Sequence, residues 1–271
     1  MLIEIFTLLC AAGLAISGSL TFWPVHQWYD FYIPIVLAIA GYALGIILVC
    51  AWLSIAMLFV DNKKEYDHIN KWARFWFLQG LYYINKHSLA IVKIKGKEKL
   101  PKNQRFVMVC NHKSKFDSML ISEHFAKYDI AFITKRSNRK IPWGGRFMNG
   151  MCYLSIDRDD KLQSLSQFKR AVELIKNNVC SIGVFPEGTR HPEDGLGEFH
   201  EGCFNIAIKS GAPLVIFTTK NTVKVNKNFP FKFTKVIIEI VGVIPNEEIS
   251  DKPAKEVSDM VHKIMEENLA K

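Results

Sequence analysis

The first 60 residues contain no Lys or Arg and only two acidic residues, Glu4 and Asp30. Two long uncharged runs, mostly apolar, fill nearly all of this segment. A helix needs about 20 apolar residues to cross the hydrocarbon core of a bilayer, and both runs reach that length. The pattern predicts two transmembrane helices, at about residues 5–25 and 33–60, which make residues 1–60 a membrane anchor.

A cleaved signal peptide is the alternative interpretation of the first run, but the basic residues that begin such a peptide are missing. The connector between the two runs has no Lys or Arg, whereas Lys63 and Lys64 follow the second run. Because loops rich in Lys and Arg stay in the cytosol, we expect the connector to face outside. The expected protein is integral to the bacterial inner membrane, with its body on the cytoplasmic side.

The rest of the chain is basic. All 35 Lys and Arg and 24 of the 26 acids lie beyond residue 60, so residues 61–271 carry a formal net charge of +11. Such a charge favours anionic partners: nucleic acid, an anionic membrane surface or a phosphorylated substrate. The apolar leader favours the last two. The six cysteines form no C-x-x-C pair and no zinc-like cluster with His, so we expect reduced core residues and no metal site.

Residues 61–89 are rich in aromatic and basic side chains, which suit a linker helix at the membrane interface; an ordinary core helix is the alternative. Strand-like and helix-like runs alternate from residue 90 onwards. Strands are predicted at about 90–94, 106–110, 130–134, 152–156, 181–185, 214–218 and 236–243, and helices at about 118–125, 162–175, 202–210 and 257–269. This alternation predicts an α/β domain over residues 90–271, with a mixed, largely parallel sheet flanked by helices.

The first candidate site follows the strand predicted at 106–110 and reads Asn-His-Lys-Ser-Lys-Phe-Asp over residues 111–117. Sheets of α/β domains carry reactive groups at the carboxyl ends of their strands. His112 and Asp117 can form a dyad, in which the carboxylate holds one ring nitrogen and leaves the other as a general base. A second pair with the same spacing, His124 and Asp129, has no reactive neighbours, and we interpret it as structural.

The second candidate site, Phe-Pro-Glu-Gly-Thr-Arg at residues 185–190, also follows an apolar strand. Gly188 lets the backbone approach a ligand, Thr189 offers a donor, and the guanidinium of Arg190 suits a phosphate. A plain proline-glycine turn is the alternative. Between the two sites lies a stretch rich in glycine and cations, from Lys135 to Arg158, which suits an anionic pocket; two surface charges are the simpler interpretation of these cations.

These segments occur in a fixed order. The block at 111–117 is followed by Lys135, an Ile-Pro…Gly…Ile-Asp-Arg block ending at Arg158, the block at 185–190, Glu-Gly at 201–202 and Gly-Ala-Pro at 211–213. Over about residues 90–220 the chain thereby resembles the glycerolipid acyltransferase family, whose best-known members are 1-acylglycerol-3-phosphate acyltransferases. The family usually has a proline two or three residues beyond the position of Pro213, in a block expected to shape the acyl or acceptor pocket. This chain has Ile216 and Phe217 there.

The resemblance implies an enzyme that transfers a fatty acyl group from acyl-CoA or acyl carrier protein to the sn-2 hydroxyl of 1-acylglycerol 3-phosphate. The product would be phosphatidic acid, for phospholipid synthesis. His112, held by Asp117, would take the hydroxyl proton, and Lys135 or nearby backbone amides would stabilise the oxyanion. Arg190 would bind the phosphate. The other residues assigned to substrate binding are Glu187, Gly188, Thr189 and, in an assisting role, Arg158. No cofactor is expected, because the thioester co-substrate is already activated.

Three alternatives stay open. In the first, the acceptor is another lysophospholipid or glycerol 3-phosphate. In the second, the chain is a membrane-tethered hydrolase that uses the same dyad, although no G-x-S-x-G motif occurs. In the third, it binds lipids without catalysis, but the intact pair of His112 and Asp117 argues against this. The expected partners are a lipid acceptor, an acyl thioester and the bilayer, and no nucleic acid.

Overall fold

A central sheet organises the body of the protein. The computed structural model describes residues 1–21, 32–157, 159–193 and 195–270. Its strands are β1 (Ala90–Lys95), β2 (Val107–Cys110), β3 (Ile130–Lys135), β4 (Leu154–Ile156), β5 (Ser181–Val184), β6 (Leu214–Lys220) and β7 (Thr234–Ile244). They lie in the order β1-β7-β6-β2-β5-β3-β4. Strands β6, β2, β5, β3 and β4 are parallel, whereas β7 is antiparallel to β6 and β1 is parallel to β7. The predicted mixed, largely parallel sheet is confirmed.

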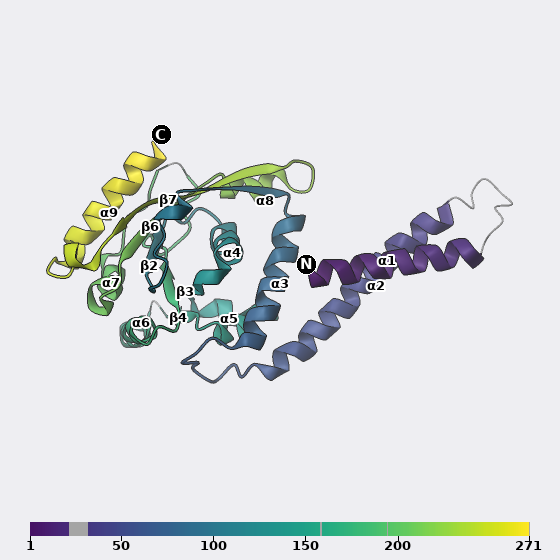
Figure 1. Cartoon of the computed structure of the whole chain (residues 1–271), viewed down its shortest axis with the longest axis horizontal. Helices are drawn as coiled ribbons and strands as arrows, with labels where there is room; N and C mark the ends of the chain where they lie inside the picture. Colours follow the sequence, from purple (N-terminus) through teal and green to yellow (C-terminus); the bar gives the residue numbers. More distant parts are fainter. Residues whose placement is uncertain (22–31, 158, 194, 271) are drawn as a thin grey trace.

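Helices cover both faces of this sheet (Figure 1). They are α3 (Lys71–His87), α4 (Lys115–His124), α5 (Gly144–Gly150), α6 (Lys161–Lys176), α7 (Asn205–Ser210), α8 (Thr222–Asn228) and α9 (Ala254–Leu269). Helices α3, α4 and α5 lie on one side, and α6, α7 and α9 lie on the other. Every residue of β2 and β5 is buried, because both faces of these central strands are covered. Their apolar runs therefore lack the alternation of a half-exposed strand.

Helix caps fix where several helices begin and end. Helix α4 begins at residue 115, three residues earlier than predicted, because Ser114 caps it: its hydroxyl accepts the amide of Phe116, and Asp117 accepts the amide of Ser114. Asp160 caps α6 by accepting the amide of Gln163, and Gly211, with φ of +75°, ends α7. Helices α5 and α8 were not predicted, since each has only seven residues and no apolar periodicity.

The two N-terminal helices, α1 (Leu2–Thr21) and α2 (Tyr32–Ala56), form a hairpin that projects from the body (Figure 1). Both are long and apolar enough to cross a membrane. Glycines bring them close: a Cβ on Gly41 would lie 2.5 Å from the carbonyl oxygen of Cys10, so a larger residue would push the helices apart. Residues 22–31, which hold the predicted outward-facing connector, lie outside the described residues.

Helix α3 joins the hairpin to the body. It begins after Asn70, whose side chain accepts the amide of Ala73. At one end the indole Nε1 of Trp72 donates to the carbonyl of Ala56 (2.9 Å), and towards the other end the hydroxyls of Tyr42 and Tyr83 lie 2.8 Å apart. Hydrogen bonds thus connect α2 with α3 near both ends of α3, and the two helices run in opposite directions. One side of α3 is buried in the body while Trp72 stays partly exposed, so the helix combines features of both interpretations of residues 61–89.

Candidate active site

Parallel strands bring both candidate sites to one edge of the sheet. Strands β2, β5 and β6 run in the same direction and are neighbours, so their carboxyl ends lie together. His112 comes two residues after β2, the block at 185–190 directly follows β5, and Thr219 lies near the end of β6. The fold thus joins residues that are separated by more than 100 positions in the sequence.

The predicted dyad is present. Nδ1 of His112 lies 3.0 Å from Oδ2 of Asp117, whose side chain has no exposed surface. Oδ2 also accepts the backbone amides of Lys113 and Ser114, both at 2.7 Å, and Oδ1 accepts the hydroxyl of Thr219 at 2.9 Å. Four donors therefore hold the carboxylate in place. With Nδ1 bound to Asp117, Nε2 is the ring nitrogen left for substrate.

Two phenylalanines hold the plane of the imidazole. The ring of His112 stacks on Phe185 with centroids 4.1 Å apart and an interplanar angle of 19°. Phe185 stacks in turn on Phe132, at 5.3 Å and 11°. Phe185 is the first residue of the second candidate block, so that block supports the histidine ring directly. Stacking leaves only small rotations open to a side chain that is already held at Nδ1.

Glu187 ties the two candidate blocks together. Its side chain is buried, with Oε1 accepting the backbone amide of His112 (2.6 Å) and Oε2 that of Gly197 (2.9 Å). Both carboxylate oxygens thus bind backbone amides, so the Glu187 side chain shapes the loop. Gly188, with φ of +65°, closes the turn by donating its amide to the carbonyl of Phe185 (3.0 Å). The amide of His191 donates to the carbonyl of His112 (2.8 Å), which holds the end of the block beside the dyad.

A cavity of about 530 Å³ begins at the dyad and reaches the N-terminal helices. His112 and Arg190 both line it. Most of its remaining wall is apolar and comes from α2, α3, α5 and the segment before α5, with Ile46, Leu53, Phe77, Leu81, Trp143 and Phe147 among the lining residues. An imidazole and a guanidinium therefore share a hollow whose walls suit a hydrocarbon chain.

The cations are not all placed as the sequence predicts. Arg190 is exposed, and its guanidinium makes no ion pair within the described part of the chain; the neighbouring Thr189 is also exposed. Lys135 is exposed at the end of β3 and does not line the cavity. Lys115 does line it, although the sequence analysis assigns no role to this residue. Arg158 lies outside the described residues.

Sequence analysis also missed two residues, Asn111 and Thr219, that support the dyad through hydrogen bonds. The side chain of Asn111 is fully buried and pairs with the backbone of Thr219: Oδ1 accepts its amide (2.8 Å) and Nδ2 donates to its carbonyl (3.0 Å). The hydroxyl of Thr219 then reaches Asp117. Asn111 is the first residue of the block at 111–117, so sequence analysis could have identified it. Thr219 lies in no motif, and only the pairing of β2 with β6 reveals it.

The structure also places the two residues that stand where the family has a proline, and the second His and Asp pair. Ile216 and Phe217, which stand where the family usually has a proline, are buried in the core of β6 and do not line the cavity. Neither residue therefore contacts a ligand in this cavity directly. The second pair is structural as predicted: Nδ1 of His124 bonds to the carbonyl of Leu120 (3.0 Å), and Asp129 accepts from Arg74 (2.7 Å).

A cysteine nucleophile is unsuited to this site. Cys110 is fully buried directly before Asn111. Burial, and after it the negative charge of Asp117, raise the pKa of the Cys110 thiol well above its ordinary value. The thiolate needed for nucleophilic attack is therefore suppressed at neutral pH. Cys152, Cys180 and Cys203 are also buried, as expected for core residues.

Comparisons with known proteins agree with this geometry. A family model described as "Acyltransferase" matches residues 91–220. A chloroplastic 1-acyl-sn-glycerol-3-phosphate acyltransferase of Brassica napus is 32% identical over 170 residues, which cover 62% of this chain and 46% of the relative. The 1-acyl-sn-glycerol-3-phosphate acyltransferase of Escherichia coli is 27% identical over 167 residues, covering 60% of this chain and 66% of the relative. The chain thus spans about half the length of the plant relative.

The fold comparison covers almost the whole chain. The crystal structure of the 1-acyl-sn-glycerophosphate acyltransferase of Thermotoga maritima matches with a TM-score of 0.60 and 25% identity, over 99% of this chain and 96% of that chain. Fold, dyad and matched region together define an acyltransferase. Residues 91–220 match the acyltransferase family model, and over this region the chain is similar to 1-acyl-sn-glycerol-3-phosphate acyltransferases.

Proposed function

We propose that this enzyme transfers a fatty acyl group from an acyl-CoA or acyl carrier protein thioester to the sn-2 hydroxyl of 1-acylglycerol 3-phosphate, giving phosphatidic acid. One observation carries the proposal: His112, held by the buried Asp117, lines the same apolar cavity as Arg190, whose guanidinium makes no ion pair with the residues that the structure describes. A base, a cation and a hydrocarbon-compatible volume are what a phosphorylated lipid acceptor requires. The names of the relatives in Brassica napus and Escherichia coli point to the same acceptor.

The reaction needs no covalent intermediate on the enzyme. Nε2 of His112 takes the proton of the acceptor hydroxyl while Asp117 stabilises the imidazolium that forms. The freed oxygen attacks the thioester carbonyl, the new C–O bond forms, and the C–S bond breaks. The proton held by His112 passes to the departing thiolate. Within the described residues the His112 ring hydrogen-bonds only to Asp117, so the attacking oxygen comes from a bound molecule and not from an enzyme side chain.

Binding divides between polar and apolar groups. Arg190 and Lys115, which both line the cavity, take the phosphate by charge-assisted hydrogen bonds. The apolar walls take an acyl chain, with each buried methylene contributing about 0.8 kcal/mol. Thr189 and Gly188 shape the turn that presents Arg190. Backbone amides near the dyad stabilise the oxyanion, for which Lys135 is the alternative predicted from the sequence. Arg158, which is outside the described residues, keeps the assisting role that the resemblance implies.

A product assay tests the proposal. The purified full-length protein is given 1-acylglycerol 3-phosphate, glycerol 3-phosphate and lysophospholipids with larger head groups, each with acyl-CoA and with acyl carrier protein, and products are identified by mass spectrometry. We expect phosphatidic acid as the main product. Release of free fatty acid without acceptor consumption would identify a hydrolase. Transfer only to acceptors without a terminal phosphate would contradict the assignment of Arg190.

The orientation in the membrane is part of the proposal. Helices α1 and α2 insert in the bacterial inner membrane and the body lies on the cytoplasmic side, since Lys and Arg begin only after residue 60. A cysteine introduced at His26, within the connector, should react with a membrane-impermeant reagent added outside intact cells. A cysteine introduced at Lys252 of the body should react only after lysis. Labelling of the second variant alone in intact cells would reverse the orientation.

A further inference from the structure

Three phenylalanines stand exposed on one loop between α8 and β7. Phe229, Phe231 and Phe233 are 53%, 95% and 64% exposed, and we call residues 229–233 the aromatic loop. The surface of a soluble domain rarely presents large apolar side chains in such a group without a partner for them. The loop belongs to no part of the active site, since none of its residues lines the cavity.

Lysines surround these rings. Lys224, Lys227, Lys232 and Lys235 are all exposed, and none of them makes an ion pair with any residue that the structure describes. The sequence contains no Asp or Glu from residue 202 to residue 238. The aromatic loop is therefore both apolar at its tip and uniformly positive around it, a combination that suits an anionic lipid surface.

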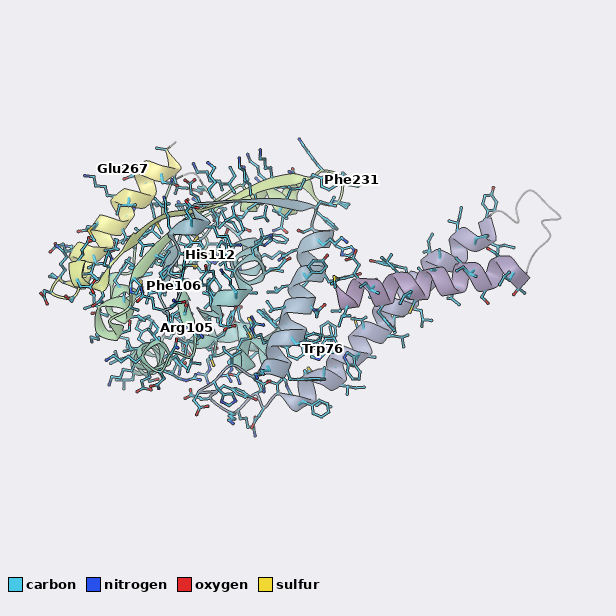
Figure 2. All side chains as sticks on the ribbon, viewed as in Figure 1. Trp76, Arg105, Phe106, His112, Phe231 and Glu267 are labelled. Carbon is cyan, nitrogen blue, oxygen red and sulfur yellow. The ribbon has the colours of Figure 1, made fainter. Side chains whose placement is uncertain are left out.

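The loop lies beside the attachment point of the N-terminal hairpin. The amide of Thr234 donates to the carbonyl of Leu89 (2.9 Å), two residues beyond the end of α3. The same end of α3 binds α2 through His87 and Tyr42 (3.1 Å) and α1 through an ion pair between Lys86 and Glu4. Figure 2 shows Phe231 on the end of the body from which the hairpin projects. Phe231 and the candidate membrane helices thus lie at the same end of the body.

We propose that the aromatic loop inserts its three phenylalanines into the anionic surface of the same bilayer that holds α1 and α2. The four lysines in and around the loop pair with lipid phosphates while the rings enter the interfacial region, where aromatic side chains are favoured. Ile91, 57% exposed and opposite Lys235 on the neighbouring strand, extends the contact. Two separate contacts with the bilayer fix how the body is tilted on it. This inference goes beyond the proposed function and does not depend on which acceptor is used.

Local insertion is measured on the full-length protein in vesicles. Phe231→Trp places a fluorescent reporter at the loop tip. Because the parent protein already has six Trp, the signal of the reporter is the fluorescence of the variant minus that of the parent. The matched control is Leu162→Trp, because Leu162 is 81% exposed on α6, on the opposite side of the sheet from α3. We expect the added fluorescence of Phe231→Trp to shift to shorter wavelength and to be quenched by brominated lipids, and that of Leu162→Trp to do neither. No shift and no quenching at residue 231 would overturn the proposal.

A second experiment tests whether the lysines around the loop contribute to insertion, and whether the loop binds lipid or a protein partner. In vesicles with anionic phosphatidylglycerol, Lys227→Gln combined with Lys232→Gln should lower the insertion equilibrium by about fivefold for each lysine removed. In neutral phosphatidylcholine vesicles the two changes should have little effect. An acidic acyl carrier protein is the competing occupant of a basic loop. If the reporter responds to added carrier protein but not to brominated lipid, the loop binds that protein and the lipid proposal is wrong.

Discussion

The hydroxyl of Thr219 lies 2.9 Å from Oδ1 of Asp117, on the carboxylate oxygen that does not bind His112. The preceding residue, Thr218, donates instead to Oδ1 of Asn268 at the end of α9 (2.8 Å). Both threonines are buried, and they face opposite sides because side chains alternate along a strand. Adjacent residues of β6 thus serve the active site and the packing of the last helix, respectively.

Thr219→Val is expected to lower kcat by about tenfold with little change in KM. The substitution keeps the shape of the side chain but removes a hydrogen bond to a charged group, a contribution of about 1.5–3 kcal/mol, of which the dyad loses a part. Thr218→Val is the matched control: it should lower the melting temperature to a similar degree and leave kcat unchanged. Thiol release and thermal unfolding measure the two effects. Equal kcat in both variants would mean that Thr219 does not position Asp117.

His112→Ala should lower kcat by about 10²–10⁴-fold, the usual contribution of a general base, while the protein still folds and enters the membrane. The chain supplies its own control, because His124 has the same spacing to Asp129 but bonds to a helix carbonyl. His124→Ala should keep kcat within a few-fold. Comparable losses in the two variants, at equal amounts of folded protein, would remove the catalytic assignment of His112.

Asp117→Asn should lower both activity and stability. An amide cannot stabilise the imidazolium, and its NH₂ group would oppose donors that now reach the carboxylate from Lys113, Ser114 or Thr219. We expect kcat to fall by at least about 100-fold. Ser114→Ala separates the cap from the catalysis: losing this N-cap should cost about 1 kcal/mol of unfolding free energy with kcat nearly unchanged. Similar kcat in the two variants would mean that Asp117 acts only as a helix cap.

The sequence was sufficient for the sheet and for the dyad because both depend on local patterns. Buried central strands appear as short apolar runs, and His112 and Asp117 lie within one turn at the start of α4. Helices α5 and α8 were missed because seven residues without apolar periodicity carry no helical signal. Their boundaries depend on contacts made in the folded chain.

The rest of the site could not be predicted because it depends on pairing between distant segments. Thr219 reaches Asp117 only because β6 lies beside β2, and no spacing in the sequence encodes that neighbour. Lys135 belongs to a recognised block, yet it ends a strand two positions away from β2 in the sheet and lies off the cavity. Motif membership thus predicts which segments meet, but not which side chain of a segment faces the substrate.

Arg190→Ala should lower kcat/KM by roughly 10- to 150-fold with a phosphate-bearing acceptor, which corresponds to the loss of about 1.5–3 kcal/mol from a charged hydrogen bond. The guanidinium has no ion-pair partner among the described residues, so its removal leaves no unpaired carboxylate behind. The same variant is measured with a matched acceptor that lacks the phosphate. An equal loss with both acceptors would show that Arg190 does not bind that group.

Lys115→Ala and Lys135→Ala together test whether the cavity or the motif better identifies the second cation. Lys115 lines the cavity with His112 and Arg190, whereas Lys135 does not. Both lysines are exposed and make no ion pair within the described residues, so neither change should alter stability by more than about 0.5 kcal/mol. We expect Lys115→Ala to raise KM for the phosphate acceptor by about 10-fold and Lys135→Ala to change kcat and KM by no more than a few-fold. A fall in kcat of about 100-fold in Lys135→Ala alone would instead restore the oxyanion role predicted from the sequence, since removal of one oxyanion donor has an effect of that size.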